Sequence, residues 1–450
     1  MAAALSGLVL PATQPGIAKA DAKYDLIHKL APFMDVHLLF PVLNYYATVK
    51  LYKNEDILQA KVALSRPTKM VEFCVQMYKE LHNTTEVPAD LEAHQQKVFE
   101  EYDQAEDKCD ALLAVTEDKD LYEELIASGN WTAEYLAAHH EVDAACIQAY
   151  YDCAKFKYEC GEYNVAAKQL YDYLKLVPEG SPQELNALWG KLVSEILSEA
   201  WEEALQDLHK LKNAIDKSYL SALQQLQMKS WMLHWSLFIF FNHPSGMDEL
   251  VDFFLAHIDT IQSNCPWLLR YLAATVLSNP RRANKMDEVV RVVVEEEYTY
   301  SDPITRFIKK LFVDYDFDGA QEELSECEAV LVTDIFLCRF SIDKAVIKHV
   351  VDEFMQHARM FVFESYCRIH RRIDLVVLAG KLGMPVSDAE RWVVDLIGRA
   401  SLNAKIDCSE NHVLMTVQHA SIYQRVINKT KDLSFRSYLL ASGLERALHE

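Results

Sequence analysis

The stretch VSDAERWVVDLIGRASLNAKIDCSENHVLM, from Val386 to Met415, decides the fold class of the carboxyl-terminal part of this chain. Ser387 followed by Glu390 three positions later forms a capping box, so a helix is predicted to begin there. Apolar residues then recur at helical spacing and form one stripe of Trp392, Val393, Leu396, Ile397 and Ala400. After Ser401 the period changes to two, and two alternating runs joined by CSEN predict a β-hairpin over residues 402–417.

Two further helices are predicted just before this stretch. Residues 352–370 have the spacing of a long helix, and residues 374–382 that of a short one ended by Gly383, which suits a left-handed cap. Three helices followed by a hairpin is the order of a winged-helix domain, in which a β-wing follows a helix-turn-helix. We therefore predict a winged helix over residues 351–420.

The charge of the third helix decides between nucleic acid and protein as the partner of this domain. Between residues 387 and 400, two arginines stand against three carboxylates, which leaves a net charge of −1. DNA readers owe most of their affinity to Lys and Arg that neutralise phosphates, so this helix is ill suited to DNA. We expect it to dock protein, with the wing edge accepting a strand from another chain. The residues expected to carry this contact are Trp392, Leu396, Ile406, Val413 and Met415.

The chain before the winged helix is predicted to consist of helical repeats. From Tyr24 to Phe336 the apolar spacing is helical almost throughout, and the whole chain has only 12 glycines in 450 residues. An aromatic residue, then Ala three positions on, then Leu seven positions on, occurs as Tyr163, Ala166, Leu170; Trp201, Ala204, Leu208; and Phe317, Ala320, Leu324. The small Ala lets a neighbouring helix approach closely. The first two copies are 38 residues apart and the last two 116, about three times 38, which predicts a tetratricopeptide-like stack of helical hairpins.

The end of the chain is predicted to be another amphipathic helix. Residues 429–449 place Leu433, Leu440 and Leu444 among its apolar positions. A terminal helix with such a face needs a partner, so these three leucines are predicted to contact another protein.

Charge is distributed unevenly along the chain. The balance of 45 Lys and Arg against 67 Asp and Glu gives −22, which argues against a free-standing nucleic-acid binder. Residues 82–143 carry −14 of this, either as a solvated outer helix face or as a surface for a basic partner. Residues 354–382, in contrast, carry +3, and the segment RIHRR contains Arg368, Arg371 and Arg372. Those arginines either pair with acidic residues or contact RNA.

The sequence offers no pattern typical of an enzyme. The motifs GxxxxGK[ST], GxGxxG, GxSxG and HExxH are missing, so we predict neither catalysis nor a bound cofactor. Ten cysteines without a CxxC pair favour a reducing compartment. Cys146, Cys153 and Cys160 fall at seven-residue steps, but spread over about 21 Å of helix they cannot share a metal, so we predict that they are buried.

No segment is predicted to enter a membrane. The leader MAAALSGLVLPATQPGIAKA has no early Lys or Arg and fits a secretory signal poorly, so we interpret it as a flexible extension. The most apolar run, Trp231 to Phe241, has 11 residues, whereas a span needs about 20. It is predicted to be a buried helix, with His234 as a hydrogen-bonded core histidine.

Helical repeats that lead into a winged helix and a terminal helix resemble the PCI domain, which occurs in components of the proteasome lid, the signalosome and translation initiation factor 3. Local sequences narrow the resemblance to the family of the e subunit of eukaryotic translation initiation factor 3, from about Tyr24 to the end. The matching segments are YDLIHKLAPFMDVHLLFPVL, AKFKYECGEYNVAAKQLY, NALWGKLVSEIL, WMLHWSLFIFFNHP, EEYTYSDPITRFIKKLFVDYDFDGAQEELSECEAVL, FESYCRIH, AERWVVDLIGRASLNAKID and KTKDLSFRSYLL.

The resemblance implies a cytoplasmic scaffold, with a nuclear pool, that has no catalytic activity. Its partners would be other PCI and MPN subunits of the factor, joined through the winged helix and a shared helical bundle. The complex would bind the small ribosomal subunit and support recruitment of mRNA and initiator tRNA. A scaffold of the proteasome lid or signalosome, and a winged-helix RNA-binding protein, are the alternatives. The expected organisation is a leader at 1–20, helical repeats at 21–218, the helical part of the PCI domain at 219–350, the winged helix at 351–420 and a terminal helix at 421–450.

Overall fold

The computed structural model describes most of the chain, and it divides into two compact units, Met1–Ala358 and Arg359–Glu450. The described residues are 24–49, 52–84, 86–140, 142–178, 180–340, 343–370, 372–377, 391, 393–394, 404–407, 412–415 and 422–449. The predicted leader therefore lies outside the described residues.

The first unit is helical throughout its described part. Its elements are α1 (Ile27–Leu30), the 3₁₀ helix η2 (Ala31–Phe33), α2 (Val36–Val49), α3 (Asn54–Ser65), α4 (Val71–His82), α5 (Ala89–Asp107), α6 (Asp110–Glu117), α7 (Lys119–Ala127), α8 (Ala133–His139), α9 (Ala144–Cys160), α10 (Tyr163–Leu176), α11 (Pro182–Leu197), α12 (Trp201–Lys217), α13 (Ala222–Asn242), α14 (Gly246–Ala256), α15 (Ile258–Asn264), η3 (Pro266–Leu268), α16 (Leu269–Ser278), η4 (Pro280–Lys285), α17 (Met286–Glu295), α18 (Pro303–Lys309), the π-helix η5 (Lys310–Asp314) and α19 (Phe317–Thr333). Helix α20 (Lys344–Ile369) then crosses the boundary between the units.

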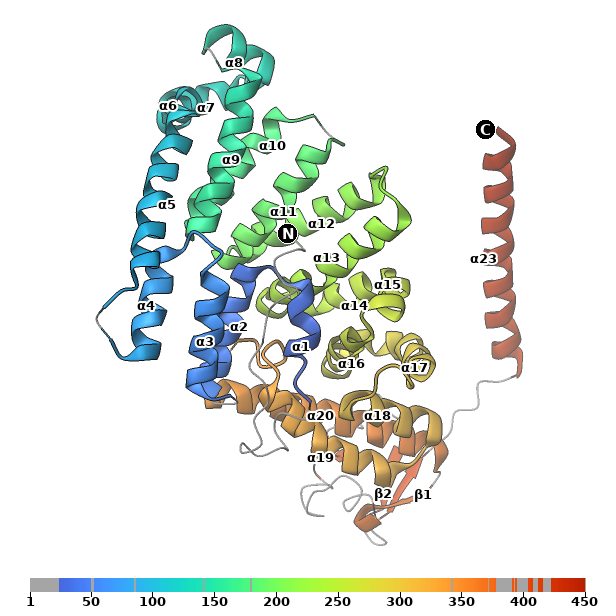
Figure 1. Ribbon diagram of the computed structural model, residues 1–450. Helices are drawn as coiled ribbons and strands as arrows, with labels where there is room; N and C mark the ends of the chain where they lie inside the picture. The colour runs from blue at the N-terminus through green and yellow to red at the C-terminus, as the bar shows by residue number, and fades with distance from the viewer. Residues whose placement is uncertain are drawn as a thin grey trace. The chain divides into compact units, whose positions relative to one another are not determined.

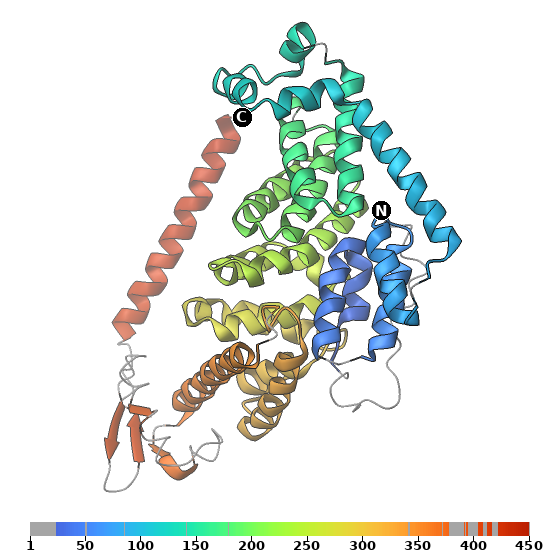
Figure 2. The ribbon, with the colours of Figure 1, turned by 90° about the vertical axis from the view of Figure 1, so that its left-hand side faces the viewer.

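The predicted stack of helical hairpins is confirmed. Helices α10 to α16 follow one another as a stack in both ribbon views (Figure 1, Figure 2). Each copy of the aromatic–Ala–Leu pattern begins a helix, at the first residue of α10, α12 and α19. Ala166, Ala204 and Ala320 are fully buried. Because Ala has the smallest side chain that still favours a helix, it permits the close helix–helix approach that this stacking requires.

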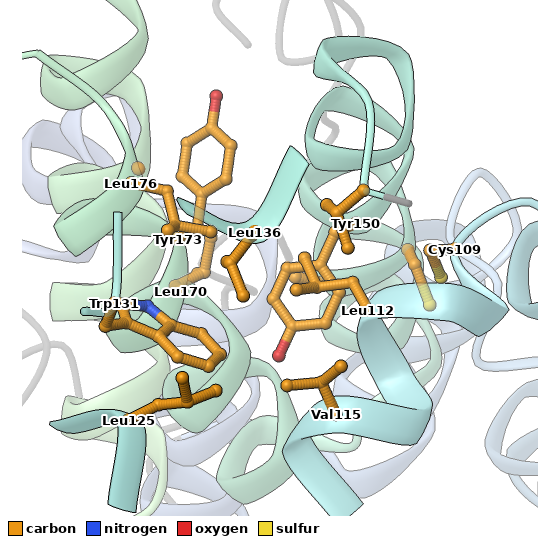
Figure 3. Close-up of a cluster of buried hydrophobic side chains, with 14 residues drawn as sticks. Cys109, Leu112, Val115, Leu125, Trp131, Leu136, Tyr150, Leu170, Tyr173 and Leu176 are labelled. Carbon is orange, nitrogen blue, oxygen red and sulfur yellow. The ribbon is translucent and has the colours of Figure 1, made fainter. Parts of the chain in front are cut away.

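The acidic span packs an apolar face onto the stack and leaves most of its carboxylates exposed. Figure 3 shows side chains of α6, α7 and α8 meeting those of α9 and α10 around Leu112, Leu136 and Tyr150. Trp131, in the same cluster, donates its indole N–H to the carbonyl oxygen of Asp172 at 3.2 Å. Most of the described carboxylates between residues 82 and 143 lie on the solvent side. This arrangement agrees with the interpretation of a solvated outer face.

Helix α13 is the predicted buried helix, and His234 is its core histidine. The imidazole is fully buried and stacks on the ring of Phe33, with centroids 4.4 Å apart. Its Nδ1 lies 2.7 Å from the carbonyl oxygen of Ser230, and its Nε2 accepts the indole N–H of Trp267 at 3.0 Å. Burial lowers the pKa of His234 to about 4, so the ring is neutral in the folded chain.

The N-terminal segment, Tyr24 to Asp35, forms hydrogen bonds with helices that are distant from one another in the sequence. Trp235 on α13 donates its indole N–H to the carbonyl oxygen of Phe33 at 3.1 Å, and Tyr158 on α9 donates its hydroxyl to Asp35 at 2.5 Å. Tyr24 donates to Glu326 on α19, also at 2.5 Å. A single segment of about a dozen residues therefore contacts helices from both ends of the repeat array.

Two buried clusters of charge join neighbouring helices. Between α11 and α12, Lys191 contacts both Glu195, at 2.5 Å, and Asp207. Burial, followed by the repulsion of Asp207, raises the pKa of Glu195 to about 7. Further along, Arg270 on α16 is 2% exposed and donates to Asp302 at 2.8 Å and to Asp334 at 3.1 Å.

The carboxylates around Arg270 also accept hydrogen bonds from backbone N–H groups at helix ends. Asp302 caps α18 by accepting the backbone N–H of Thr305 at 2.8 Å, and Asp334 follows the last residue of α19 and accepts the N–H of Phe336 at 3.1 Å. Tyr271 adds a hydroxyl hydrogen bond to Asp334 at 3.1 Å. Three segments that are distant in sequence thus share one hydrogen-bonded polar core.

The second unit contains the remaining part of α20, a small sheet and one long helix. Its elements are β1 (Arg372–Asp374), β2 (Ala404–Asp407), β3 (His412–Met415) and α23 (Ile422–His449). The sheet is antiparallel with the order β1-β3-β2, and β2 with β3 confirms the predicted hairpin. A helix was predicted to start at Asp374, and this was wrong by one residue, since Asp374 ends β1 and the helical backbone begins at Leu375.

Two predicted helix starts were also late. Helix α20 begins at Lys344 rather than 352, because the Asp343 side chain accepts the backbone N–H of Ala345 at 2.9 Å. The β-branched residues of AVIKHVV weaken the helical signal there. Helix α23 begins at Ile422 rather than 429. The predicted capping box at Ser387 and the rest of the short helix after Val377 lie outside the described residues.

Replacing Arg270 with Met should lower the free energy of unfolding of the first unit by about 3 to 5 kcal/mol, because two carboxylates stay buried without their cation. Thermal unfolding followed by circular dichroism measures the effect. Arg281→Met is the matched control, since the Arg281 side chain is 85% exposed and its nearest carboxylate oxygen is 3.9 Å away. Equal midpoints for the two variants would contradict the importance of the buried cluster.

The chain should lose stability through His234 as the pH falls. Its pKa is about 4 in the folded chain and near the ordinary 6.5 when unfolded, so below pH 6.5 the unfolded state binds a proton that the folded state does not. The loss reaches about 3 kcal/mol near pH 4. The difference in denaturation midpoint between pH 7.5 and 5 should be smaller for His234→Gln, which keeps an acceptor but does not titrate. An equal difference in both proteins would show that His234 is not responsible.

Candidate protein-interaction surfaces

The sheet of the second unit is organised around one buried row of apolar residues. Val413 on the central strand β3 faces Ile373 of β1 on one side and Ile406 of β2 on the other. Val413 and Ile373 are buried. Met415 lies two residues further along β3, so its position is on the same face as Val413. Val413 is therefore a residue that holds the sheet together, while Ile406 and Met415 are placed by backbone register alone.

The opposite face of the sheet carries mixed polar and apolar residues. The two rows that flank the Val413 row are Arg372, Leu414 and Lys405 on one side and Asp374, His412 and Asp407 on the other. Leu414 is 43% exposed. This face combines an exposed apolar side chain with charges of both signs, as the rim of a protein-binding surface does.

Two strand edges are positioned for a further strand. Within the described part of the chain, β1 and β2 each pair only with β3. An edge strand presents backbone N–H and C=O groups that a strand of another chain can pair with. The predicted use of the wing edge is therefore compatible with the sheet order.

The helix that precedes the hairpin is described only in part. Trp392 and Leu396, both predicted contact residues, lie outside the described residues. Of their neighbours, Val393 is fully buried and Val394 is 53% exposed. Helical backbone at Arg391, Val393 and Val394 agrees with the predicted helix.

Helix α23 presents a continuous apolar face. Val426, Leu433 and Leu440 follow one another at seven-residue steps, so they lie along one side of the helix. A shallow groove on the helix surface is lined by Val426, Ile427, Thr430, Lys431, Ser434, Phe435 and Tyr438. The large apolar side chains of α23 that the structure describes are between 46 and 81% exposed. Leu444 continues the row of Leu440 at the helical spacing of four, although its side chain is outside the described set.

The predicted basic segment is spread over two elements. Arg368 lies in the last turn of α20, Arg372 is exposed on β1, and Arg371 between them is outside the described residues. Their positions follow the chain around the end of α20 and into the sheet.

The described residues contain no group of three or more His, Cys, Asp or Glu side chains placed to hold a metal ion. Of the three cysteines at seven-residue steps, Cys153 is fully buried, while Cys146 and Cys160 are half-buried on α9. Among the helices of the described chain, none has both the length and the apolar character needed to cross a membrane.

Comparison with known proteins assigns the chain to a family. A model described as the eIF3 subunit 6 N terminal domain matches residues 25–157, and the PCI domain model matches residues 332–416. A third model, for the C-terminal part of the E subunit of eukaryotic translation initiation factor 3, matches residues 421–441. Relatives named as the same E subunit match nearly the whole chain: 39% identity over 426 residues in Arabidopsis thaliana, covering 94% of this chain and 96% of the relative, and 36% over 436 residues in Bombyx mori, covering 94% and 96%. This chain belongs to the family of the E subunit of eukaryotic translation initiation factor 3.

The family assignment confirms the resemblance seen in the local sequences. The matched N-terminal domain runs from α1 into α9, and the PCI match contains α20 and all three strands. The matched carboxyl-terminal segment falls on α23. The exposed apolar face of α23 is thus part of a segment for which this initiation factor family has a separate model.

Val413→Asp should disrupt the sheet, because it places a charge in the buried row between Ile373 and Ile406. Hydrogen–deuterium exchange of the intact chain should become at least about tenfold faster at β1 and β3. Leu414→Asp changes the adjacent, exposed position by the same substitution and should leave exchange near the wild-type rate. Faster exchange in both variants would contradict the description of Val413 as buried and Leu414 as exposed.

Proposed function

We propose that this chain is a non-catalytic scaffold subunit of the translation initiation factor 3 complex. The observation that carries the proposal is the exposed apolar face of α23, with Val426, Leu433 and Leu440 in one row. A 28-residue helix whose described large apolar side chains are exposed is unfavourable alone, and packing against partner helices removes that cost. The seven-residue step of the row suits a bundle of roughly parallel helices.

The winged-helix sheet would supply the second contact. An edge strand, β1 or β2, would accept a strand of a neighbouring PCI protein, and the helix containing Trp392 and Leu396 would pack beside it. In this arrangement the buried pair of Val413 and Ile373 keeps the sheet in register, which supports the exposed edge. The proposed partners are other PCI and MPN subunits of initiation factor 3.

The names of the relatives support membership of the initiation factor 3 complex, and the cellular role is proposed on that basis. As part of the complex, the chain would help to bind the small ribosomal subunit and to recruit mRNA and initiator tRNA in the cytoplasm, with a further pool in the nucleus. The names support initiation factor 3 over the proteasome lid or the signalosome as the host complex. Contact with RNA through Arg368, Arg371 and Arg372 remains a secondary proposal, supported by the exposure of Arg372.

Changing Leu433 and Leu440 together to Asp should remove the tagged chain from the complex, because it interrupts the apolar row with two charges. Affinity purification followed by mass spectrometry should recover about tenfold less of the other initiation factor subunits. The control variant, Lys429→Asp with Arg436→Asp, introduces two aspartates at the same seven-residue step outside that row. Full recovery of partners with the leucine variant would refute the role of α23, and loss with both variants would point to charge instead of apolar packing.

A further inference from the structure

A cavity of about 380 Å³ lies in the first unit, where the N-terminal segment crosses three helices of the stack. Its wall comes from the link between η2 and α2 and from α9, α11 and α13, whose order along the stack is visible in Figure 1. We call it the tryptophan cavity, after the three tryptophans among its lining residues: Pro32, Phe33, Met34, Asp35, Val36, Tyr151, Lys155, Asn186, Trp189, Met228, Trp231 and Trp235. Its volume is within the range of sites that bind small ligands or single side chains.

The tryptophans form walls at right angles. The ring of Trp189 is inclined by 86° to that of Trp235 at 4.7 Å and by 83° to that of Trp231 at 6.3 Å. Indole faces are electron-rich and attract cations, and several rings around one space strengthen that attraction. A wall that contains indole rings favours a cationic group over an anionic one.

One carboxylate in the wall has unused capacity to accept hydrogen bonds. Asp35 is half-buried, and both of its hydrogen bonds, from the Tyr158 hydroxyl and the His37 backbone N–H, end on Oδ1. In the described chain its other oxygen, Oδ2, has no such bond. An apolar occupant would remove water from this carboxylate without replacing it, which is costly, whereas a cation with N–H donors would compensate.

Two tryptophan indole N–H groups belong to residues of the cavity wall. Trp235 donates its indole N–H to the Phe33 carbonyl, so this wall already binds one peptide segment, that of the chain itself. The indole N–H of Trp189, which is 8% exposed, has no acceptor within the described residues.

Among the lining residues, Lys155 is the single cation. Its ammonium lies 4.0 Å from Glu159, and its side chain is 54% exposed, so it stands at the margin and not among the tryptophans. With one carboxylate inside and one lysine at the margin, in a chain of net charge −22, the electrostatics favour a positively charged occupant.

We propose that the tryptophan cavity binds an arginine side chain carried by a peptide segment of a partner protein. The planar guanidinium would stack on an indole face and donate to Asp35. This inference concerns the first unit and does not rest on the function proposed for α23.

Tryptophan fluorescence of the full-length chain, titrated at constant ionic strength, tests the proposal. The probe is acetyl-Gly-Arg-Gly-amide, and the matched control is the same peptide with citrulline, which has the shape of arginine without its charge. We expect saturable quenching by the arginine peptide and at least tenfold weaker binding of the citrulline peptide. Equal binding of both peptides, or saturation by neither below about 10 mM, would overturn the proposal.

Two variants identify the site. Asp35→Asn keeps an acceptor for Tyr158 and His37 but removes the charge, so it should weaken arginine-peptide binding about tenfold. Lys155→Glu alters an exposed side chain and should strengthen binding about threefold, since it replaces a repelling charge with an attracting one. Weaker binding by Lys155→Glu, with an unchanged melting temperature, would mean that the cavity does not recognise a cation.

Discussion

The buried ion cluster of Arg270 is the interaction on which the carboxyl-terminal half of the helical stack depends. One guanidinium on α16 bonds to Asp302 at the start of α18 and to Asp334 after the end of α19. Burying these charges is costly unless every partner is in place, so the cluster permits one arrangement of the three helices and disfavours near alternatives. The two carboxylates also bond to backbone N–H groups, which links the position of the helices to the way their ends are formed.

The N-terminal segment also joins helices that are distant in the sequence, through single hydrogen bonds and not through a buried ion cluster. Its carbonyl at Phe33 and its carboxylate at Asp35 accept hydrogen bonds from α13 and α9, and Tyr24 reaches α19. In a simple solenoid each repeat contacts only its neighbours, so a segment that contacts distant repeats adds cooperativity to the array. The tryptophan cavity exists because this segment crosses the stack without filling all the space beside Trp189 and Trp231.

Two ionisable groups with shifted pKa values, His234 and Glu195, are explained by packing. His234 is neutral because it is enclosed between Phe33 and Trp267, and the pKa of Glu195 is raised because burial and Asp207 oppose its charge. Both groups lie where helices meet and have structural partners. In the second unit, by contrast, the exposed residues of note are apolar, and apolar surface in water is what association with other proteins removes. The unusual residues of the first unit contribute to its stability, while those of the second unit leave apolar surface exposed.

The sequence by itself determined the features that depend on local periodicity. The helical hairpins, the buried helix around His234, the hairpin of β2 and β3 and the apolar row of α23 all follow from repeats of about 3.6 or two residues. The predicted interaction residues were found in the same way, and the structure places Leu433 and Leu440 on an exposed face but Val413 in a buried one.

Only the tertiary structure decided the features that join distant parts of the chain. Strand β1 has three residues, too few to show a period, and it is a strand because Ile373 pairs with Val413 forty residues later. Phe33 and Trp235 are 202 positions apart, and Arg270 meets Asp334 across 64. Such contacts are fixed by the relative placement of helices, which depends on the packing of all their side chains together. No local pattern contains that information, which is why the buried cluster and the tryptophan cavity could not be predicted from the sequence.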